Sequence, residues 1–320
     1  MKSSVVISTY NGSKYIIEQL ESIRKQERVP DEVIIIDDCS KDNTARIVKQ
    51  YIENNNLKNW QLHINATNKG WKKNFFDGIN MSSGDVVFPC DQDDVWHLDK
   101  ISKMMSIMEK NDNISVLEGK PHRFFDEDNV KTNKRSVRTI IGIILDKRDA
   151  KANQSKNSEK VSIKQFDSSF MKRAPGCALA IRCDCFHELK RYWFDEMPHD
   201  ALLTYFPLVS AQYYIFDYEV IEWRQHVGSA SRPKERNKKR RIEELMLDKK
   251  MLDVLSRYAS VNNISNSVAN SINCAKRWNT ARIDVVKNKR FSAIPLLFKY
   301  QNYYIQKRRI ITDIKYSLER

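Results

Sequence analysis

The chain has 320 residues, of which 41% are hydrophobic, 10% aromatic and 30% charged. This composition argues against an intrinsically disordered protein. A mean hydropathy of −0.61 and the lack of any run of 18 apolar residues argue against an integral membrane protein. The length suits one large α/β domain with an appendage, or two modest domains.

The net charge of +14 is concentrated in the C-terminal part of the chain. Residues 1–230 carry 33 basic and 33 acidic side chains, whereas residues 231–320 carry 22 basic and 8 acidic ones. Such a basic segment predicts a surface that contacts phosphates, either of a nucleic acid or of an anionic membrane.

Glycine-rich phosphate-binding motifs are absent. The eight Gly residues are spaced so that GxGxxG, the P-loop and GxSxG do not occur. A phosphorylated ligand would therefore be neutralised by another device. The six Cys residues show no disulfide spacing, and the N-terminus shows no secretory signal pattern. We therefore expect a cytoplasmic protein with reduced thiols.

Short apolar runs alternate with amphipathic stretches along the first hundred residues. Strands are expected at residues 4–8, 32–37, 60–65 and 85–90, and helices at 13–27, 43–55, 71–82 and 97–110. This alternation predicts an α/β fold with a mostly parallel sheet flanked by helices.

The pattern changes twice further along the chain. Residues 126–164 are polar and rich in Lys apart from the apolar run 139–145, and we expect a mobile loop there. Strands are expected at 176–182 and 218–226, and helices at 184–191 and after Asp200. After Ser231 a polybasic run, 232–241, introduces helices alone. We therefore expect a catalytic or binding domain at 1–230 and a basic helical region at 231–320.

Polar side chains follow three of the expected strands, where parallel sheets bind ligands. The sharpest case is Asp91-Gln92-Asp93-Asp94, because neighbouring carboxylates form a hard oxygen site for Mg²⁺ or Mn²⁺. The alternative is a solvated turn in which Asp94 caps the next helix. After the second strand, Asp38 has the chemistry to accept the imide N–H of a pyrimidine base, while Ser40 or Asp42 caps the following helix.

Seven motifs occur together in the order and spacing of one enzyme family. They are STYNGSKYIIEQLESI, DEVIIIDDCSKDNT, NKGWKKNF, SSGDVVFPCDQDDVW, GCALAIR, PHDALL and WRQH. Over residues 1–230 the chain therefore resembles family 2 glycosyltransferases, and among them bacterial rhamnosyltransferase-like members. The resemblance implies a GT-A fold, which is Rossmann-like, a nucleotide-diphospho-sugar donor, a divalent metal and inversion at the anomeric carbon.

The resemblance also implies roles for individual residues. Asp93 would be the direct metal ligand, Asp91 would reach the ribose or a metal-bound water, and His226 would lie near the metal and the diphosphate. Asp200 would be the catalytic base. The residues that would hold or adjoin the nucleotide are Thr9, Tyr10, Asn11, Asp38, Asn68, Gly70 and Lys73.

The sequence departs from the family pattern at two places. Ala201-Leu202 stand where relatives often have aromatic residues, and Val227 follows His226 where glycine is usual. These departures bear on the acceptor and the sugar rather than on the reaction class. The alternatives for two site residues also stay open, since Asp200 suits a helix N-cap and His226 an ordinary structural role.

We therefore expect an inverting glycosyltransferase that uses Mn²⁺ or Mg²⁺ and a UDP- or dTDP-sugar. Its acceptor would be a hydroxyl of a growing, lipid-linked cell-surface polysaccharide such as a capsule. The protein would be peripheral at the cytoplasmic face of the inner membrane, a possible homo-oligomer, and without a nucleic-acid partner.

Two rival functions and one rival packing remain. A sugar-nucleotide pyrophosphorylase would need a glycine-rich first loop, which STYNGSKY replaces. A non-catalytic nucleic-acid- or membrane-binding protein would act through the basic C-terminal region. That function leaves unexplained the segment Asp91-Gln92-Asp93-Asp94, which we call the acidic turn. The aromatic stretch 294–305 suits either an interfacial helix or a helical subdomain packed on the protein or on a second subunit.

Overall fold

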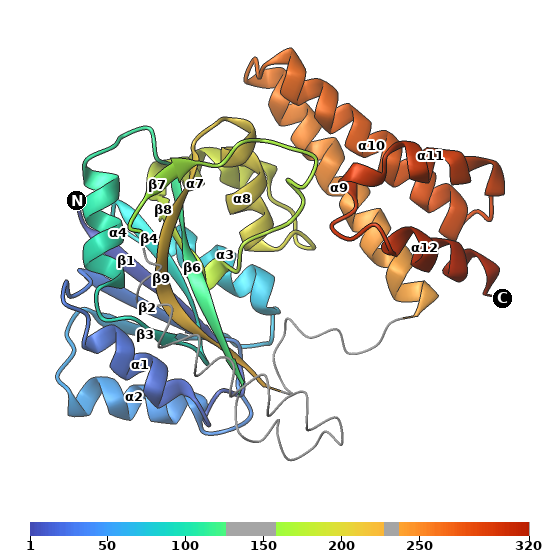
Figure 1. Ribbon diagram of the computed structural model, residues 1–320. Helices are drawn as coiled ribbons and strands as arrows, with labels where there is room; N and C mark the ends of the chain where they lie inside the picture. Colours follow the sequence, from blue (N-terminus) through green and yellow to red (C-terminus); the bar gives the residue numbers. More distant parts are fainter. Residues whose placement is uncertain (126–157, 227–236, 320) are drawn as a thin grey trace. The chain divides into compact units, whose positions relative to one another are not determined.

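The computed structural model describes residues 1–125, 158–226 and 237–319 (Figure 1). Most of the loop expected at 126–164, including the apolar run 139–145, lies outside the described residues, as does 232–236 of the basic run. The described residues divide into two compact units. Unit 1 comprises those within Met1–Ile163, Ala174–Lys190 and Tyr213–Arg232, and unit 2 those within Lys164–Arg173, Arg191–Gln212 and Pro233–Arg320.

A mixed nine-stranded sheet forms the centre of unit 1. Its strands are β1 Ser3–Thr9, β2 Glu32–Asp37, β3 Trp60–Ile64, β4 Val86–Asp91, β5 Val95–Trp96, β6 Val116–Phe125, β7 Val161–Ile163, β8 Leu179–Arg182 and β9 Tyr213–Gln225. They follow one another in the order β3-β2-β1-β4-β8-β6-β9-β5, with β7 also paired to β9. The first four strands in this order are parallel, and the four N-terminal strands are confirmed to within one residue at each end.

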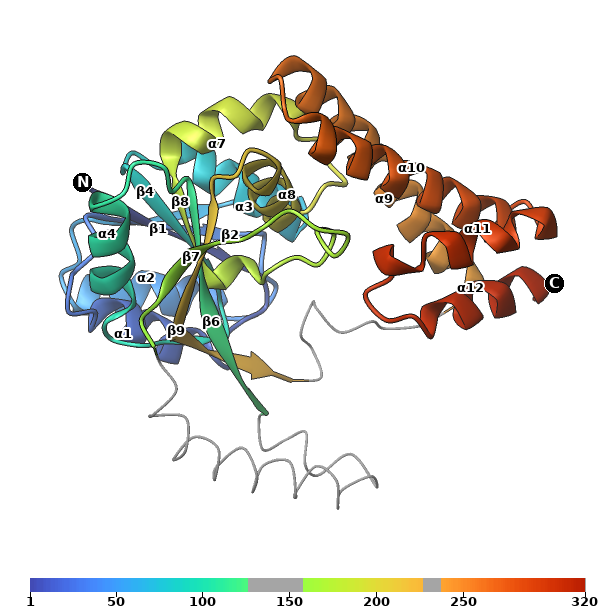
Figure 2. The same cartoon turned by 45° about the horizontal axis from the view of Figure 1, so that its top comes forward.

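Helices cover both faces of this sheet (Figures 1 and 2). Those of unit 1 are α1 Ile16–Arg24, α2 Thr44–Asn54, α3 Trp71–Met81, α4 Lys100–Glu109 and α7 Cys183–Leu189. The connections through α1 and α2 run from β1 to β2 to β3, toward one side of the sheet, whereas the connection through α3 runs back past β1 to β4. Because such crossovers are right-handed, α3 lies on the opposite face from α1 and α2. Of the four apolar residues that recur along α1 in the sequence, Ile16, Leu20 and Ile23 are fully buried as expected, whereas Ile17 is 43% exposed.

Strands β5, β6 and β7 were not expected from the sequence. β6 contains Gly119 and Pro121 among charged residues, and its register with β9 shifts between Glu118 and Pro121. It is a strand because β9 pairs along its whole length, and a Cβ at Gly119 would lie 2.5 Å from Val220 Cγ2. The expected strand 176–182 begins later, because residues 176–178 form a short 3₁₀ helix before β8.

The regular elements of unit 2 in the described part of the chain are helices, and those after residue 231 agree with the expectation of helices alone there. They are α8 His199–Val209, α9 Lys238–Val261, α10 Asn266–Val286, α11 Ile294–Lys299 and α12 Arg309–Leu318, with short 3₁₀ turns between them. Residues 164–173 and 191–212 group with the C-terminal helices. The division at residue 230 that the sequence suggested stays a prediction. None of the described helices has an apolar stretch that would cross a bilayer.

Aromatic residues and a buried ion network hold the C-terminal helices together. Trp278, Leu297 and Tyr304 form their apolar core. Asp313 is fully buried and accepts from Arg241 Nε at 2.8 Å and from Arg282 Nε at 2.9 Å. The aromatic stretch 294–305 is thus partly packed into a helical subdomain, while Leu296, Phe298 and Ile305 remain 40%, 52% and 48% exposed.

Candidate active site

The sheet has a topological switch point between β1 and β4, where the connections change direction. β1 ends at Thr9 and β4 ends at Asp91, and Ser8 pairs with Asp91 in the parallel register. The polar segments that the sequence placed after β1, β2 and β4 therefore share one edge of unit 1. This edge is where an open α/β sheet forms its ligand crevice.

Gln92 ties the ends of β1 and β4 together. Its Oε1 accepts from the backbone N–H of Tyr10 at 2.8 Å, and its Nε2 donates to the Tyr10 carbonyl at 3.1 Å. A Cβ at Gly12 would lie 2.2 Å from Gln92 Oε1, so only glycine leaves room for this contact. The central residue of the acidic turn thus orients the loop after β1.

Asn11 joins the loop after β1 to the loop after β2. It has a positive φ of 49°, its N–H donates to Ser40 Oγ at 2.9 Å, and its Oδ1 accepts from Lys41 N at 2.8 Å. Asp42 Oδ1 accepts from Thr44 N, the first residue of α2, at 2.9 Å. The residues around Asn11 and Asp42 therefore connect the two loops. Asp42 bonds the first backbone N–H of α2, but the N-cap of this helix is Asn43 rather than the expected Ser40 or Asp42.

Asp38 organises the segment before α3. Its carboxylate accepts from Asn65 Nδ2 at 2.9 Å, from Lys69 N at 2.8 Å and from Gly70 N at 2.8 Å, while Asn68 Nδ2 donates to its carbonyl at 3.1 Å. Gly70 has a φ of 83°, which glycine adopts without strain. Asp38 is 2% exposed, and three of its roughly four acceptor positions are used within the protein. The structure thus brings Asp38, Asn68 and Gly70 together.

The other expected nucleotide residues differ in exposure. Thr9 is buried, and its Oγ1 donates to Asp37 Oδ2 at 3.3 Å. Tyr10 is 44% exposed at the same edge, and Lys73 forms an ion pair with Asp77 one turn along α3. Tyr10 therefore offers a ring to a ligand, whereas Thr9 acts through its neighbours.

Asp93 and His226 meet although 133 residues separate them in the sequence. Asp93 Oδ2 lies 2.6 Å from His226 Nε2, and each side chain is 17% exposed. The imidazole also packs against the ring of Tyr15, with 4.8 Å between the centroids. A carboxylate and an imidazole that share this edge form a polar pair accessible to a ligand.

Arg224 supports this pair and was not singled out from the sequence. Its Nε donates to the Asp93 carbonyl at 2.8 Å, and its guanidinium lies over the rings of Tyr15 and Phe124. It also forms an ion pair with Glu18 of α1. Since Arg224 and His226 are two residues apart at the end of β9, the strand period puts them on one face, which is the signal in the sequence.

Asp94 does not cap α4, whose N-cap is Asp99. Asp94 is 1% exposed, and its Oδ1 accepts from Arg224 N at 3.0 Å, while its Oδ2 has no hydrogen-bond partner among the described residues. Burial and the charges of Asp91 and Asp93 raise its pKa well above the usual range. Protonation or a nearby cation relieves the cost of burying a carboxyl group in this way.

Asp91, Asp94 and Cys177 each offer a ligand atom within 4.8 Å of the others. Burial raises the pKa of the Cys177 thiol well above its usual value, so the soft thiolate is not formed at neutral pH. This group contains the expected ligand Asp91 but neither Asp93 nor His226, and without the thiolate its donors are carboxylate oxygens. This chemistry fits Mg²⁺ or Mn²⁺.

Lys100 lies fully buried in the same region and was also missed. Its Nζ donates to the Cys177 carbonyl at 2.6 Å and sits 3.5 Å from the centroid of the Trp96 ring. Burial lowers its pKa to about 8, against the opposing attraction of groups that include Asp94 and Asp91. The helical spacing of Lys100 with the buried Met104 and Met108 places it on the inner face of α4, which is the available sequence signal.

Asp200 belongs to unit 2, in the first turn of α8. The N-cap of this helix is Pro198, so Asp200 is not the cap. Its Oδ1 accepts from Arg173 at 2.8 Å, and its side chain is 17% exposed. Burial lowers the pKa of the neighbouring His199 to about 4. His199 is therefore uncharged at neutral pH.

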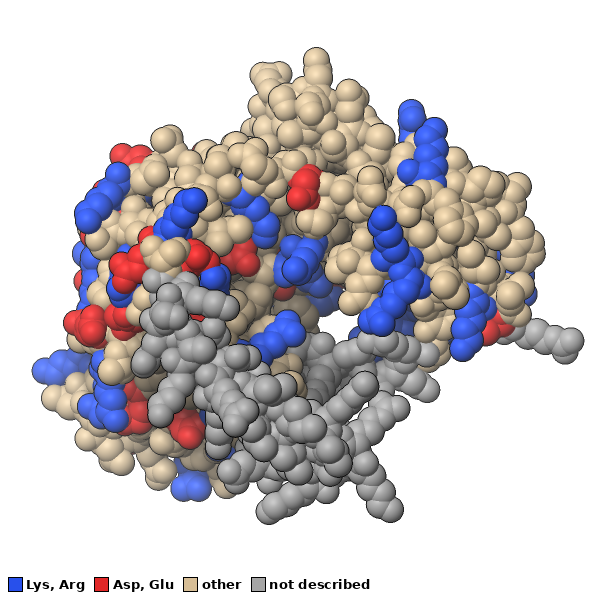
Figure 3. Space-filling view, viewed as in Figure 1, with Lys and Arg blue, Asp and Glu red and all other residues tan. Residues whose placement is uncertain are grey.

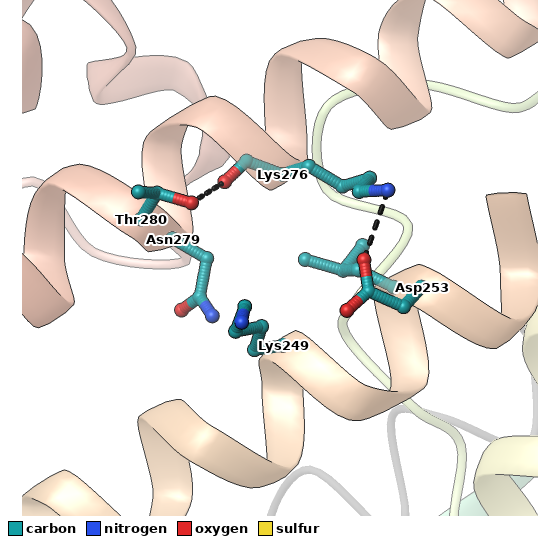
Figure 4. Close-up of a pocket in the computed structure, with 6 residues that line it drawn as sticks. Lys249, Asp253, Lys276, Asn279 and Thr280 are labelled. Atoms are coloured by element: carbon teal, nitrogen blue, oxygen red, sulfur yellow. Dashed lines mark hydrogen bonds and ion pairs between the residues drawn. The ribbon is translucent and has the colours of Figure 1, made fainter.

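A small pocket lies between α9 and α10 of unit 2 (Figure 4). Its volume is about 30 Å³. Lys276 pairs with Asp253 at 2.9 Å across it, beside Thr280 and Asn279. The pocket is too small for a nucleotide or a sugar.

Comparison with known families gives one match. The sequence profile described as glycosyl transferase family 2 matches residues 4–186. This range includes the loops after β1, β2 and β4, and it ends before Asp200 and His226.

Two named relatives match over part of their length. The chain is 41% identical to the poly(ribitol-phosphate) beta-N-acetylglucosaminyltransferase TarS of Staphylococcus aureus over 96 residues, 29% of this chain and 16% of TarS. It is 26% identical to the dTDP-rhamnosyl transferase RfbG of Shigella flexneri over 190 residues, 58% of this chain and 57% of RfbG. The matched stretches thus span less than two thirds of either relative.

Two solved structures resemble the whole chain. Staphylococcus aureus TarS 1–349 in complex with UDP-GlcNAc matches with a TM-score of 0.59 and 19% identity, over 99% of this chain and 90% of that one. The mannosyltransferase PcManGT of Pyrobaculum calidifontis, in complex with GDP-Man and Mn²⁺, matches with a TM-score of 0.53 and 15% identity, over 99% and 85%. At these identities the likeness concerns the fold.

Proposed function

The chain belongs to glycosyl transferase family 2 and has the GT-A fold, and on that premise we propose that it transfers a sugar from a nucleotide-diphospho-sugar to a hydroxyl group. The observation that carries this proposal is the convergence of Asp38, Asp93 and His226 at one edge of the sheet. Asp38 and Tyr10 would meet the base and ribose, and the acidic turn would face the diphosphate.

The acidic turn would hold Mn²⁺ or Mg²⁺. Asp91 and Asp93 are the expected ligands, with His226 beside Asp93. Asp94 is a further candidate, because its Oδ2 has no hydrogen-bond partner among the described residues and its carboxylate lies near that of Asp91. A bound divalent ion supplies Lewis-acid stabilisation of the departing diphosphate. Arg224 fixes the backbone of Asp93, and Gln92 fixes the loop after β1, so these two residues set the shape of the turn.

Asp200 would act as the general base of an inverting transfer. The acceptor oxygen forms a bond to the anomeric carbon, the bond from that carbon to the diphosphate oxygen breaks with its electron pair, and the acceptor proton passes to Asp200. Arg173 holds Oδ1 of this carboxylate, so Oδ2 would receive the proton. A single displacement of this kind inverts the anomeric configuration and needs one base.

The donor and acceptor are proposed by class. The name of RfbG supports a dTDP-sugar as donor, the complex of TarS with UDP-GlcNAc supports a UDP-sugar, and the name of TarS supports a polymer as acceptor. A cell-surface polysaccharide such as a capsule stays a prediction. The basic C-terminal region supports a lipid-linked acceptor at the cytoplasmic face of the inner membrane. A homo-oligomer stays a prediction, and the acidic turn argues against a nucleic-acid partner.

A donor panel tests this proposal. The full chain is incubated with UDP-, dTDP- and GDP-sugars, with Mn²⁺ or with a chelator, and the release of nucleoside diphosphate is measured. We expect Mn²⁺-dependent release from one nucleotide class. Release of no nucleoside diphosphate, or formation of a nucleoside triphosphate from pyrophosphate, would contradict it, the latter in favour of a pyrophosphorylase.

A further inference from the structure

The end of the chain combines exposed cations with exposed apolar side chains. Residues 287–319 contain eight Lys and Arg residues, all exposed, and two carboxylates, Asp313 and Glu319. Asp313 is fully buried and neutralised by Arg241 and Arg282. The surface formed by these residues is therefore strongly positive. In the face that Figure 3 shows, the charged side chains over the C-terminal helices are mostly Lys and Arg, with little Asp or Glu among them.

α12 orders these two kinds of side chain along one stripe. Ile310, Asp313 and Ser317 face the interior of unit 2. Ile311, Lys315 and Leu318 follow at helical spacing, with Arg308 one turn before them, and all four are exposed. We call these four residues the α12 stripe.

The apolar members of the stripe are unusually exposed. Ile311 is 72% and Leu318 is 68% exposed, more than any other large apolar side chain in the described part of the chain. Phe291, Leu296 and Phe298, on the preceding short helices, are also 40–52% exposed. Several exposed apolar side chains within one short segment mark a surface that binds a partner or a membrane.

We propose that the α12 stripe docks on the surface of an anionic lipid bilayer. Lys and Arg side chains attract acidic headgroups, and aliphatic side chains between them insert at the boundary with the acyl chains. A second copy of the chain is a poorer occupant, because a two-fold interface would press two positive stripes together. A nucleic acid would satisfy the cations but leave Ile311 and Leu318 in water.

This inference rests on the proposed function, sugar transfer to a lipid-linked acceptor at a membrane, but its test measures membrane binding and not sugar transfer. The full chain is sedimented with vesicles of phosphatidylcholine alone, or with about 30% phosphatidylglycerol added. We expect binding to the acidic vesicles at low ionic strength and weaker binding at about 0.5 M salt. Loss of donor turnover with vesicle binding intact would count against the proposed function alone.

Two pairs of variants separate charge from apolar insertion. R308Q/K315Q is expected to weaken binding to acidic vesicles about 30-fold. K49Q/K110Q, which removes two exposed charges from unit 1, is expected to change binding little. I311S/L318S is expected to lose the part of the binding that persists at high salt, while V29S/V261S, at 62% and 66% exposed positions, keeps it.

Three results would overturn the inference. The first is equal vesicle binding by R308Q/K315Q and the unchanged protein, with thermal unfolding confirming that both are folded. The second is a stable dimer in sedimentation that I311S/L318S dissociates, which would assign the stripe to a second copy. The third is salt-sensitive DNA binding tighter than binding to acidic vesicles, which would assign it to a nucleic acid.

Discussion

Lys100 shows how one buried charge bears on the acidic turn. Its ammonium group is fully buried, with a carbonyl and an indole ring as near neighbours and the carboxylates of Asp91 and Asp94 close enough to affect its pKa. A positive charge in this place opposes the repulsion among the acidic residues when no cation is bound. Lys100 therefore couples the stability of the fold to the site.

The pH dependence of stability tests this description. The pKa of Lys100 falls from 10.5 to about 8 on folding. Between these values the unfolded chain binds more protons than the folded chain, so the lysine makes stability rise with pH and this gain is lost as the pH falls through 8. Relative to Lys100→Met, the unchanged protein should gain about 2 to 3 kcal/mol between pH 7 and pH 10.

Denaturant unfolding at several pH values measures this difference. Lys103→Met, on the same helix but at a 28% exposed side chain, is the matched control: it retains Lys100, so its stability should follow the same pH dependence as that of the unchanged protein. Parallel stability curves for Lys100→Met and the unchanged protein would show that the ammonium is not buried as described.

Asp200 is the second residue whose role depends on its surroundings. Because Arg173 holds one carboxylate oxygen, Asp200→Asn should preserve the geometry and donor affinity but reduce kcat by roughly 10²–10⁴. Steady-state kinetics of transfer and donor binding measure the two effects separately. Asp195→Asn, an exposed change nearby in the chain, should leave both unchanged, and near-normal transfer by Asp200→Asn would place the base elsewhere.

Among the elements, the pair β6–β9 depends most on tertiary context. A Cβ at Gly119 would lie 2.5 Å and 2.6 Å from the two methyl groups of the fully buried Val220. Gly119→Ala should therefore lower the free energy of unfolding by about 1–3 kcal/mol. Adding Val220→Ala should recover part of this loss, and strict additivity in the double-mutant cycle would disprove the steric explanation.

The elements predicted from the sequence are those whose own residues carry a clear apolar pattern, without help from a partner element. β1, β2 and β4 are largely buried runs, and α1 repeats Ile16, Leu20 and Ile23 at helical spacing on its buried face. β6 was missed because Gly119, Lys120 and Pro121 interrupt its pattern, and its strand form comes from β9. No local pattern marks a strand that its partner stabilises.

The candidate site follows the same rule. Motif order placed Asp38, Asn68 and Gly70 at one edge, and these three residues do contact one another. Lys100, Arg173 and Arg224 were missed, because a charged side chain is buried by contacts that form only in the folded protein. Their pattern in the sequence is that of ordinary surface charges.

At the scale of the whole molecule, the last ninety residues carry the excess positive charge and also pack against α8. Tyr258 of α9 bonds Ser210 at 2.5 Å and packs on Phe206 with 5.0 Å between ring centroids. The helix with the proposed base is therefore stabilised by residues that follow the basic run. Both belong to unit 2.

Truncation after Ser231 should consequently abolish transfer. Without α9, the apolar side of α8 is exposed, so the truncated chain should lose helical circular dichroism and be cleaved by protease around residues 191–212. A truncated chain that resists protease and retains transfer would show that α8 is stable alone. Because truncation perturbs the proposed base, point variants are the proper test of membrane docking.

The most direct test of the central claim is a calorimetric titration of the full chain with its nucleotide-sugar donor in the presence of Mn²⁺. The account predicts metal-dependent binding that Asp93→Ala weakens at least about tenfold, because Asp93 lies beside His226 at the proposed metal site. Asp112→Ala, at a 97% exposed side chain, should bind as the unchanged protein does. Donor binding by Asp93→Ala at unchanged affinity and with unchanged Mn²⁺ dependence would contradict the account.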